Sequence, residues 1–258
     1  MNIENEDWVG GAWLVATYGI VLVLPLAVVS RIGGRRASST AEGITTETHV
    51  QSMRPATGLR GHLTFHLKHE VPNLELLSRL FCIIDPQELV AWAGDEPSGQ
   101  YARRAGFLYE FLTARQLPLR AEMAGAYVDA LDSQKLVVAS PAQAVLQRRW
   151  RVRDNMPGTR NFCPVIRQTA QALTMMALDV PALLQQLALE FGDELLMRSA
   201  VWMTLREGKA SFALEGEADQ PARIGRFADA LAHRCGQGAP PLDHATLAEL
   251  QSDSPLRE

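Results

Sequence analysis

Cysteine is scarce in this 258-residue chain, which contains only Cys82, Cys163 and Cys235. The three residues lie far apart, are odd in number and form no C-x-x-C pair, which argues against a disulfide framework and against a zinc knuckle. Free cysteines of this kind are usually buried small hydrophobic residues in a reducing compartment. The sequence therefore predicts a cytoplasmic protein without disulfides.

Motifs for binding phosphates and for nucleophilic catalysis are also missing. The chain contains no G-x-G-x-x-G, no G-x-x-x-x-G-K-[ST] and no G-x-S-x-G, so neither a phosphate loop nor a nucleophile elbow is indicated. Its formal net charge of −4 argues against a protein that coats nucleic acid over its whole surface.

One histidine-rich segment, GHLTFHLKHE at residues 61–70, resembles a metal-binding pattern. His62, His66 and His69-Glu70 recur at helical spacing, so three of these groups would share one face of a helix. No second segment rich in His, Cys or Asp completes a tetrahedral ligand shell. We therefore predict no metal site and expect hydrogen-bonding roles for these histidines.

Charged residues are absent from residues 8–30, a run of 23 that is long enough for a spanning helix. Acidic residues precede it and arginines follow it, as the positive-inside rule requires. However, several glycines and Pro25 interrupt the run, and Gly19–Val29 has the β-branched composition of a buried strand. The sequence favours a soluble helix followed by a strand, and a membrane anchor stays open as an alternative.

Hydrophobic periodicity predicts a mainly α protein with a helical bundle-like C-terminal part and a mixed α/β or irregular N-terminal region. Residues 1–60 are interpreted as an apolar segment followed by a polar linker, with a short strand near Thr45–Val50. Residues 61–160 form a helical N-terminal region, and residues 161–258 form a second helical region. Within this second region, the leucines after Asp179 and the apolar residues of 193–215 are expected to face a core.

The stretch QRRWRVRD at residues 147–154 is the most basic part of the chain. Arginines that alternate with Trp150 are typical of a patch that contacts nucleic acid, so a helical nucleic-acid-binding module using Arg148–Arg153 is an alternative function. The more common role of such a stretch is a solvated face paired with nearby acids, which we favour.

A run near the end of the predicted helix 193–215 has a specific pattern, S-F-A-L-E-G. Ser211 and Glu215 lie four residues apart and would share one face of the helix. Glu215 would occupy the last turn, where the helix dipole disfavours a carboxylate. A carboxylate in that position favours a cation from outside the helix, and the forked guanidinium of arginine is the best partner.

This run resembles the [S/T]-x-x-x-E-[G/N] inhibitory motif of Fic-family proteins, which transfer AMP from ATP to hydroxyl side chains of target proteins. Ser211, Glu215 and Gly216 match the motif positions. Several blocks resemble the N-terminal region of long bacterial Fic proteins and together span nearly the whole chain: WLVATYGI (13–20), SRIGGRR (30–36), GHLTFHLKHE (61–70), YARRAGFLYEFLT (101–113), RVRDNMPGT (151–159), FCPVIRQT (162–169) and RFADAL (226–231).

The resemblance implies that Glu215 forms a salt bridge with the second arginine of the catalytic motif H-x-F-x-[D/E]-G-N-G-R-x-x-R and obstructs the ATP γ-phosphate. Neither H-x-F nor G-N-G-R occurs in the chain. We therefore expect a regulatory part truncated before the catalytic core and inactive alone, with no cofactor and no catalytic or metal-binding residue of its own. ATP and Mg²⁺ would belong to the core, which acts in cis or, as for an antitoxin, in trans.

Overall fold

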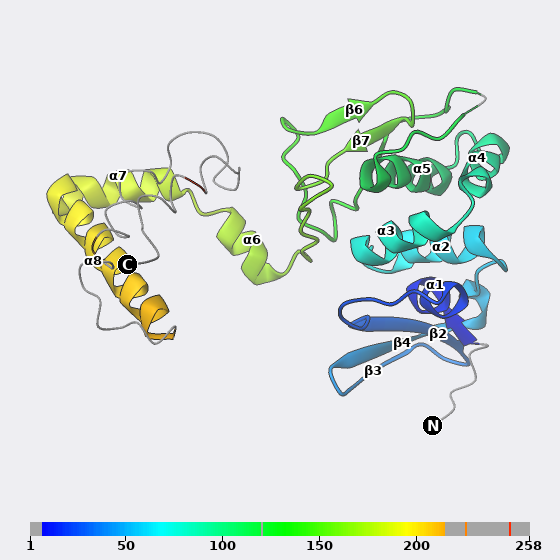
Figure 1. The fold of residues 1–258 in the computed structure, drawn as a ribbon, viewed down its shortest axis with the longest axis horizontal. Coiled ribbons are helices and arrows are strands. Elements are labelled where there is room, and N and C mark those ends of the chain that lie inside the picture. Colours follow the sequence, from blue (N-terminus) through cyan, green and yellow to red (C-terminus); the bar gives the residue numbers. More distant parts are fainter. Residues whose placement is uncertain (1–6, 120, 215–224, 226–247, 249–258) are drawn as a thin grey trace. The chain divides into compact units, whose positions relative to one another are not determined.

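A computed structural model of the chain describes residues 7–119, 121–214, 225 and 248 (Figure 1). The chain divides into two compact units, residues 1–176 and residues 177–258. Both boundaries that we placed from the sequence, after residues 60 and 160, fall inside the first unit.

The fold class is mixed α/β, and the prediction of a mainly α protein is wrong. The described residues form eight α-helices together with two sheets that each contain parallel and antiparallel neighbours. The strand predicted near Thr45–Val50 is confirmed as β4 (Ile44–Val50). Most of the other strands are short or carry small and polar residues, so that no alternation of apolar and polar side chains marks them.

The first sheet holds most of the segment that we interpreted as a polar linker. Its strands are β1 (Trp8–Val9), β2 (Val28–Gly33), β3 (Ala37–Ala41) and β4 (Ile44–Val50). Their order is β1-β2-β4-β3, with β2 and β4 parallel and the other neighbours antiparallel. A two-residue turn, Glu42-Gly43, joins β3 to β4 with positive φ at both residues, which is the geometry that a tight hairpin requires.

The uncharged run of residues 8–30 forms a short helix and then an irregular segment. Helix α1 (Gly10–Tyr18) ends at Gly19, whose φ of 61° is left-handed. The expected strand at Gly19–Val29 is displaced, because β2 begins only at Val28. Pro25, which has no N–H to donate, lies in the irregular segment between them.

The region 61–160, which we predicted to be helical, is helical only up to Thr113, because loops and short strands follow. Four helices lie between the first sheet and this point. They are α2 (Leu59–His69), α3 (Leu74–Ile83), α4 (Pro86–Asp95) and α5 (Gln100–Thr113). The side chain of Asn73 caps α3 by accepting the N–H of Leu76, and Asp85 caps α4 by accepting the N–H of Gln87. These side chains satisfy N–H groups that have no partner inside the helix.

The first unit is layered. Helices α1, α2 and α3 lie on one side of the first sheet, α4 and α5 form the next layer, and the second sheet lies beyond α5 (Figure 1). The second sheet contains β5 (Val128–Asp129), β6 (Val145–Gln147) and β7 (Val152–Asp154), in the order β5-β7-β6. A continuous hydrophobic core joins α1 to α5 and reaches Trp150 and Val152.

Trp150 is the largest fully buried side chain, with 1% of its surface exposed. It lies between β6 and β7 and packs against the backbone of α5 at Gly106. A Cβ atom at Gly106 would come within 2.0 Å of the indole ring. The absence of a side chain at this position is therefore what lets the second sheet approach α5.

The remaining helices are α6 (Ala170–Met176), α7 (Val180–Phe191) and α8 (Asp193–Leu214). Asp179 caps α7 by accepting the N–H of Ala182, and Gly192 separates α7 from α8. In the part of the chain that the structure describes, no single helix is long and apolar enough to cross a membrane; α6 and α7 pass that test together, as a bent pair, by length and composition.

The contact between Trp150 and Gly106 generates a test of the fold. We expect Gly106→Ala to lower the free energy of unfolding by about 1–3 kcal/mol, because an added methyl group overpacks the buried indole. Gly94→Ala is the matched control. Gly94 lies in α4 with nothing within 4 Å of the position of a Cβ atom, so alanine should raise the free energy of unfolding by about 0.5–1 kcal/mol. Urea unfolding followed by tryptophan fluorescence measures both. Equal stability of the two variants would contradict this packing.

Candidate functional site

The predicted inhibitory motif begins on α8. Ser211 lies close to the C-terminal end of this 22-residue helix, and its side chain is exposed. Glu215 and Gly216 lie outside the described residues, so their position at the end of the helix stays a prediction. The structure therefore places one of the three motif residues, on a helix of the expected type.

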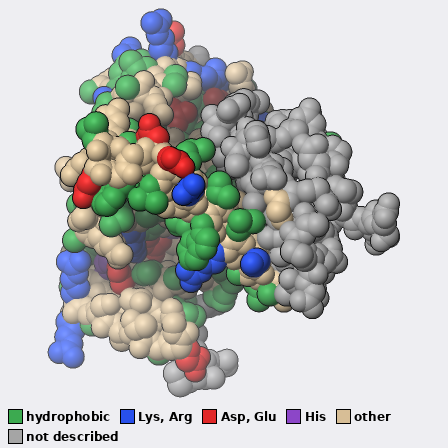
Figure 2. Space-filling view, turned by 90° about the vertical axis from the view of Figure 1, so that its left-hand side faces the viewer, with side chains coloured by type: hydrophobic (Ala, Val, Ile, Leu, Met, Phe, Trp, Pro, Cys, Tyr) green, Lys and Arg blue, Asp and Glu red, His purple; other side chains and the backbone are tan. Residues whose placement is uncertain are grey.

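Helices α7 and α8 expose most of their large apolar side chains, so our expectation that these residues face a core is wrong. No residue of α7 is buried, and Trp202 in α8 is 60% exposed. The exposed large apolar residues of the two helices are Val180, Leu183, Leu184, Leu189, Phe191, Leu195, Met197, Val201, Trp202, Met203 and Leu214. Figure 2 shows a face of the molecule on which hydrophobic side chains lie at the surface between charged ones.

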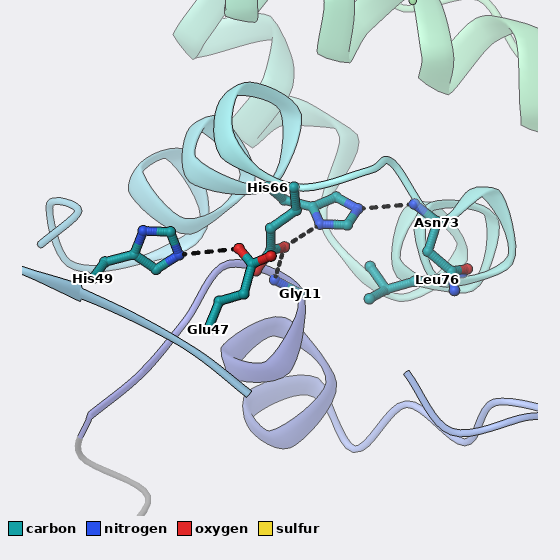
Figure 3. A network of polar contacts seen from close by, with 7 residues as sticks. Gly11, Glu47, His49, His66, Asn73 and Leu76 are labelled. Atoms are coloured by element: carbon teal, nitrogen blue, oxygen red, sulfur yellow. Dashed lines mark hydrogen bonds and ion pairs between the residues drawn. The ribbon is translucent and has the colours of Figure 1, made fainter. Parts of the chain in front are cut away.

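A buried network of hydrogen bonds forms where the start of α1, the end of α2 and the start of α3 meet (Figure 3). One carboxylate oxygen of Glu70, Oε2, accepts the backbone N–H of Gly11 at 2.8 Å and lies 2.5 Å from Nδ1 of His66. The other ring nitrogen of His66, Nε2, accepts the N–H of Asn73 at 3.1 Å. Since Nε2 accepts a hydrogen bond, we assign the proton to Nδ1, which donates it to Glu70.

Glu70 stays ionised in this network. Burial raises the pKa of the carboxyl group, but His66, the Ser30 hydroxyl and the Gly11 N–H together outweigh burial, and the pKa lies below its ordinary value. The carboxylate also faces the N-terminus of α1, where unpaired N–H groups favour a negative charge. Glu70 thus serves as a cap for α1 that is supplied from α2.

Gly10 and Gly11 make room for this carboxylate. A Cβ atom at Gly10 would lie 2.5 Å from Glu70 Oε1. Gly10 also has a φ of 60°, a backbone conformation that residues with a side chain rarely adopt. In the sequence these glycines are recognisable only as interruptions of an apolar run. The pattern that could have revealed their role is a glycine pair at a helix start, combined with a glutamate four residues after a histidine on another helix.

The histidines of α2 have separate hydrogen-bonding and packing roles. His62 stacks on Trp13 with ring centroids 3.8 Å apart, and His69 packs beside Phe65. Within the ranges that the structure describes, no group of three or more His, Cys, Asp or Glu residues could hold a metal ion. Burial lowers the pKa of His62 to about 4, with a smaller opposing effect of Glu70, so His62 is neutral at pH 7.

The basic stretch forms the turn between β6 and β7. Its aromatic residue, Trp150, is buried and cannot stack on a nucleotide base, which removes the pattern on which the nucleic-acid alternative depended. Two of its arginines bind acids, as we expected for a solvated face. Arg149 Nε lies 3.1 Å from Glu110 Oε1, and Arg153 Nη1 lies 2.5 Å from Asp129 Oδ1.

Two buried arginines of α5 were missed by the sequence analysis. Arg103 donates to the carbonyl groups of Ala126 and Arg151, and Arg104 donates to those of Ala130 and Leu67. Burial lowers the pKa of both guanidinium groups. They attach the loops around the second sheet to α5, so the two arginines in YARRAGFLYEFLT bind backbone carbonyls of this chain.

The Glu70 network generates a stability prediction. We expect Glu70→Ala to lower the free energy of unfolding by roughly 3 kcal/mol, because the N–H of Gly11 and Nδ1–H of His66 are left buried without an acceptor. The control is Glu88→Gln, which alters an exposed glutamate of α4 and should change stability by less than about 0.5 kcal/mol. Chemical denaturation at pH 7 measures both. A loss below 1 kcal/mol for Glu70→Ala would refute the capping role.

The buried His62 generates a pH prediction. A base whose pKa is lower in the folded state binds protons first in the unfolded chain, so stability should fall as the pH drops from 6.5 towards about 4. His69, whose pKa is lowered by burial and by Lys68, contributes in the same direction. We expect His62→Phe, which keeps an aromatic ring on Trp13, to flatten this dependence. Urea midpoints measured from pH 4.5 to 7.5 test it, and an unchanged slope would count against neutral His62.

No protein-family model, no curated protein and no solved structure matches this chain. Its function is therefore argued from its own residues. Three features of the chain bear on function: the motif that begins at Ser211 on α8, the exposed apolar surface of α7 and α8, and the arginines of the β6–β7 turn.

Proposed function

We propose that the chain is the regulatory, inhibitory part of a Fic-family protein adenylyltransferase and acts on a catalytic core in cis or in trans. The observation that carries this proposal is the run Ser211–Gly216, S-F-A-L-E-G, whose first four residues lie at the end of the 22-residue helix α8. Most of the large apolar side chains of α8 are exposed. Because H-x-F and G-N-G-R do not occur among the 258 residues, the transfer chemistry, with ATP and Mg²⁺, belongs to the core.

The inhibition has a simple electrostatic basis. Glu215 would pair with an arginine of the core that otherwise binds the γ-phosphate of ATP, and the nucleotide would then be held in an unproductive position. A carboxylate that occupies the required cation removes a charge-assisted interaction from the productive complex. Ser211 and Gly216 would fix the end of the helix so that Glu215 reaches its partner.

The surface of α7 and α8 supports a role that needs a partner. Many large apolar side chains of α7 and α8 are exposed, and apolar surface of this kind is typical of sites that contact another protein. A catalytic core that covers part of this surface would supply the hydrophobic contact and would place the motif at the nucleotide site. Charged residues such as Glu194 and Arg198, which pair on α8 at 3.1 Å, keep the remaining surface hydrated.

Mixing experiments with a separate core test the inhibition. We expect the chain to lower the rate of AMP transfer by a Fic core that lacks its own inhibitory helix. Glu215→Gly should restore the rate roughly 10- to 100-fold, which corresponds to a charged hydrogen bond of about 1.5–3 kcal/mol. The measurement is incorporation of labelled AMP into a hydroxyl-bearing target protein.

Two controls make this result specific. Glu207→Gln alters another exposed glutamate of α8 outside the motif and should inhibit as well as the wild-type chain. Retained binding of the Glu215→Gly variant to the core, measured by calorimetry, would show that only the ion pair was lost. The proposal fails if wild-type and Glu215→Gly chains both leave the transfer rate unchanged.

A further inference from the structure

A surface cavity of about 660 Å³ lies between the β6–β7 turn and the loop that follows α5. Its volume is within the range of roughly 300–1,000 Å³ that is typical of small-molecule sites. Residues of two kinds line it, arginines of the turn and mixed residues of the loop: Arg148, Arg149, Arg151, Leu119, Glu122 and Tyr127.

Two arginines hold the walls of this cavity in place. Arg149 binds Glu110 and donates to the carbonyl oxygen of Leu117, which attaches the loop to the turn. Buried Arg103 donates through Nη1 to Ala126 O at 2.7 Å and to Arg151 O at 3.2 Å. These contacts fix the backbone on both sides of the cavity before any ligand arrives.

Two other arginines are available to a ligand. Among the described residues, neither Arg148 nor Arg151 forms an ion pair. The guanidinium of Arg151 lies over the ring of Tyr127, with Cζ 5.7 Å from the ring centroid, and stacking of this kind leaves the N–H groups at its edge free to donate. Burial and then the charge of Arg151 lower the pKa of Arg103, so the positive charges of these two arginines lie near each other.

We propose that this cavity binds a nucleoside phosphate and that Arg148 and Arg151 bind its phosphate group. Both arginines line the cavity, and the forked guanidinium group of each matches the oxygens of a phosphate. The carboxylate of Glu122 accepts hydroxyl groups of a sugar, and Leu119 provides an apolar wall for a base. Glu122 also repels a continuous phosphate backbone, and Trp150 is buried, so the site suits a free nucleotide better than a nucleic-acid strand.

Titration of the full chain with AMP, ATP, inorganic phosphate and adenosine tests this site. We expect saturable 1:1 binding of AMP or ATP by calorimetry, weaker binding of phosphate and none of adenosine. Arg148→Gln with Arg151→Gly should weaken nucleotide binding by at least about tenfold, since two charge-assisted bonds are lost. Glycine suits position 151, whose φ is 52°, so this change does not strain the turn.

The control removes the same charge elsewhere. Arg35→Gln with Arg36→Gln alters two exposed arginines outside the cavity, between β2 and β3, and should leave nucleotide affinity within about twofold. Equal weakening by both double variants would show non-specific attraction and would overturn the site. The site would also be overturned if a single-stranded oligonucleotide bound while AMP and ATP did not, or if no phosphate compound bound saturably. Because no Fic core is present, these outcomes are independent of the inhibition test.

Discussion

The buried carboxylate of Glu70 is the interaction on which the N-terminal half of the first unit depends. It comes from α2, accepts the N–H of Gly11 at the start of α1 and lies beside Ser30 on β2. A single charged group therefore joins a helix, a sheet and a second helix in the interior of the protein. Such a group stabilises only while all its partners are present, because a buried charge without them costs several kcal/mol.

The second half of the unit depends on α5 in a comparable way. Gly106 lets Trp150 approach the helix backbone, while Arg103 and Arg104 on the same helix donate to carbonyl groups of the surrounding loops. Loops with little regular structure are thus held by side chains of a rigid helix, which supplies the hydrogen bonds that a sheet would otherwise provide. This arrangement explains how short strands such as β5 and β7 hold a defined cavity at the surface.

The prediction of a helical region at 61–160 is confirmed over α3, α4 and α5, because each helix has an apolar face and α4 has a clear start at Asp85-Pro86. In the first sheet, the strand near Thr45–Val50 was predicted and is confirmed as β4, whereas β3 was not predicted, since it consists of small and polar residues and gains its stability from pairing with β4. Glu70 was noticed only as a metal-ligand candidate. Its acceptor role depends on Gly11, 59 residues away, and no local pattern reveals such a contact.

In the second unit the helices were predicted, but the burial of their apolar side chains was predicted wrongly. An apolar stripe identifies the side of a helix that will be covered but says nothing of what covers it. On α7 and α8 the apolar residues lie at the surface, and Leu189 is 90% exposed. The guanidinium carbon of Arg206 lies over the exposed ring of Trp202, 5.5 Å from the ring centroid. Helix α8 carries Ser211 near its C-terminal end and exposes most of its large apolar residues, so the sequence pattern identified the helix correctly but not the surroundings of its apolar side chains.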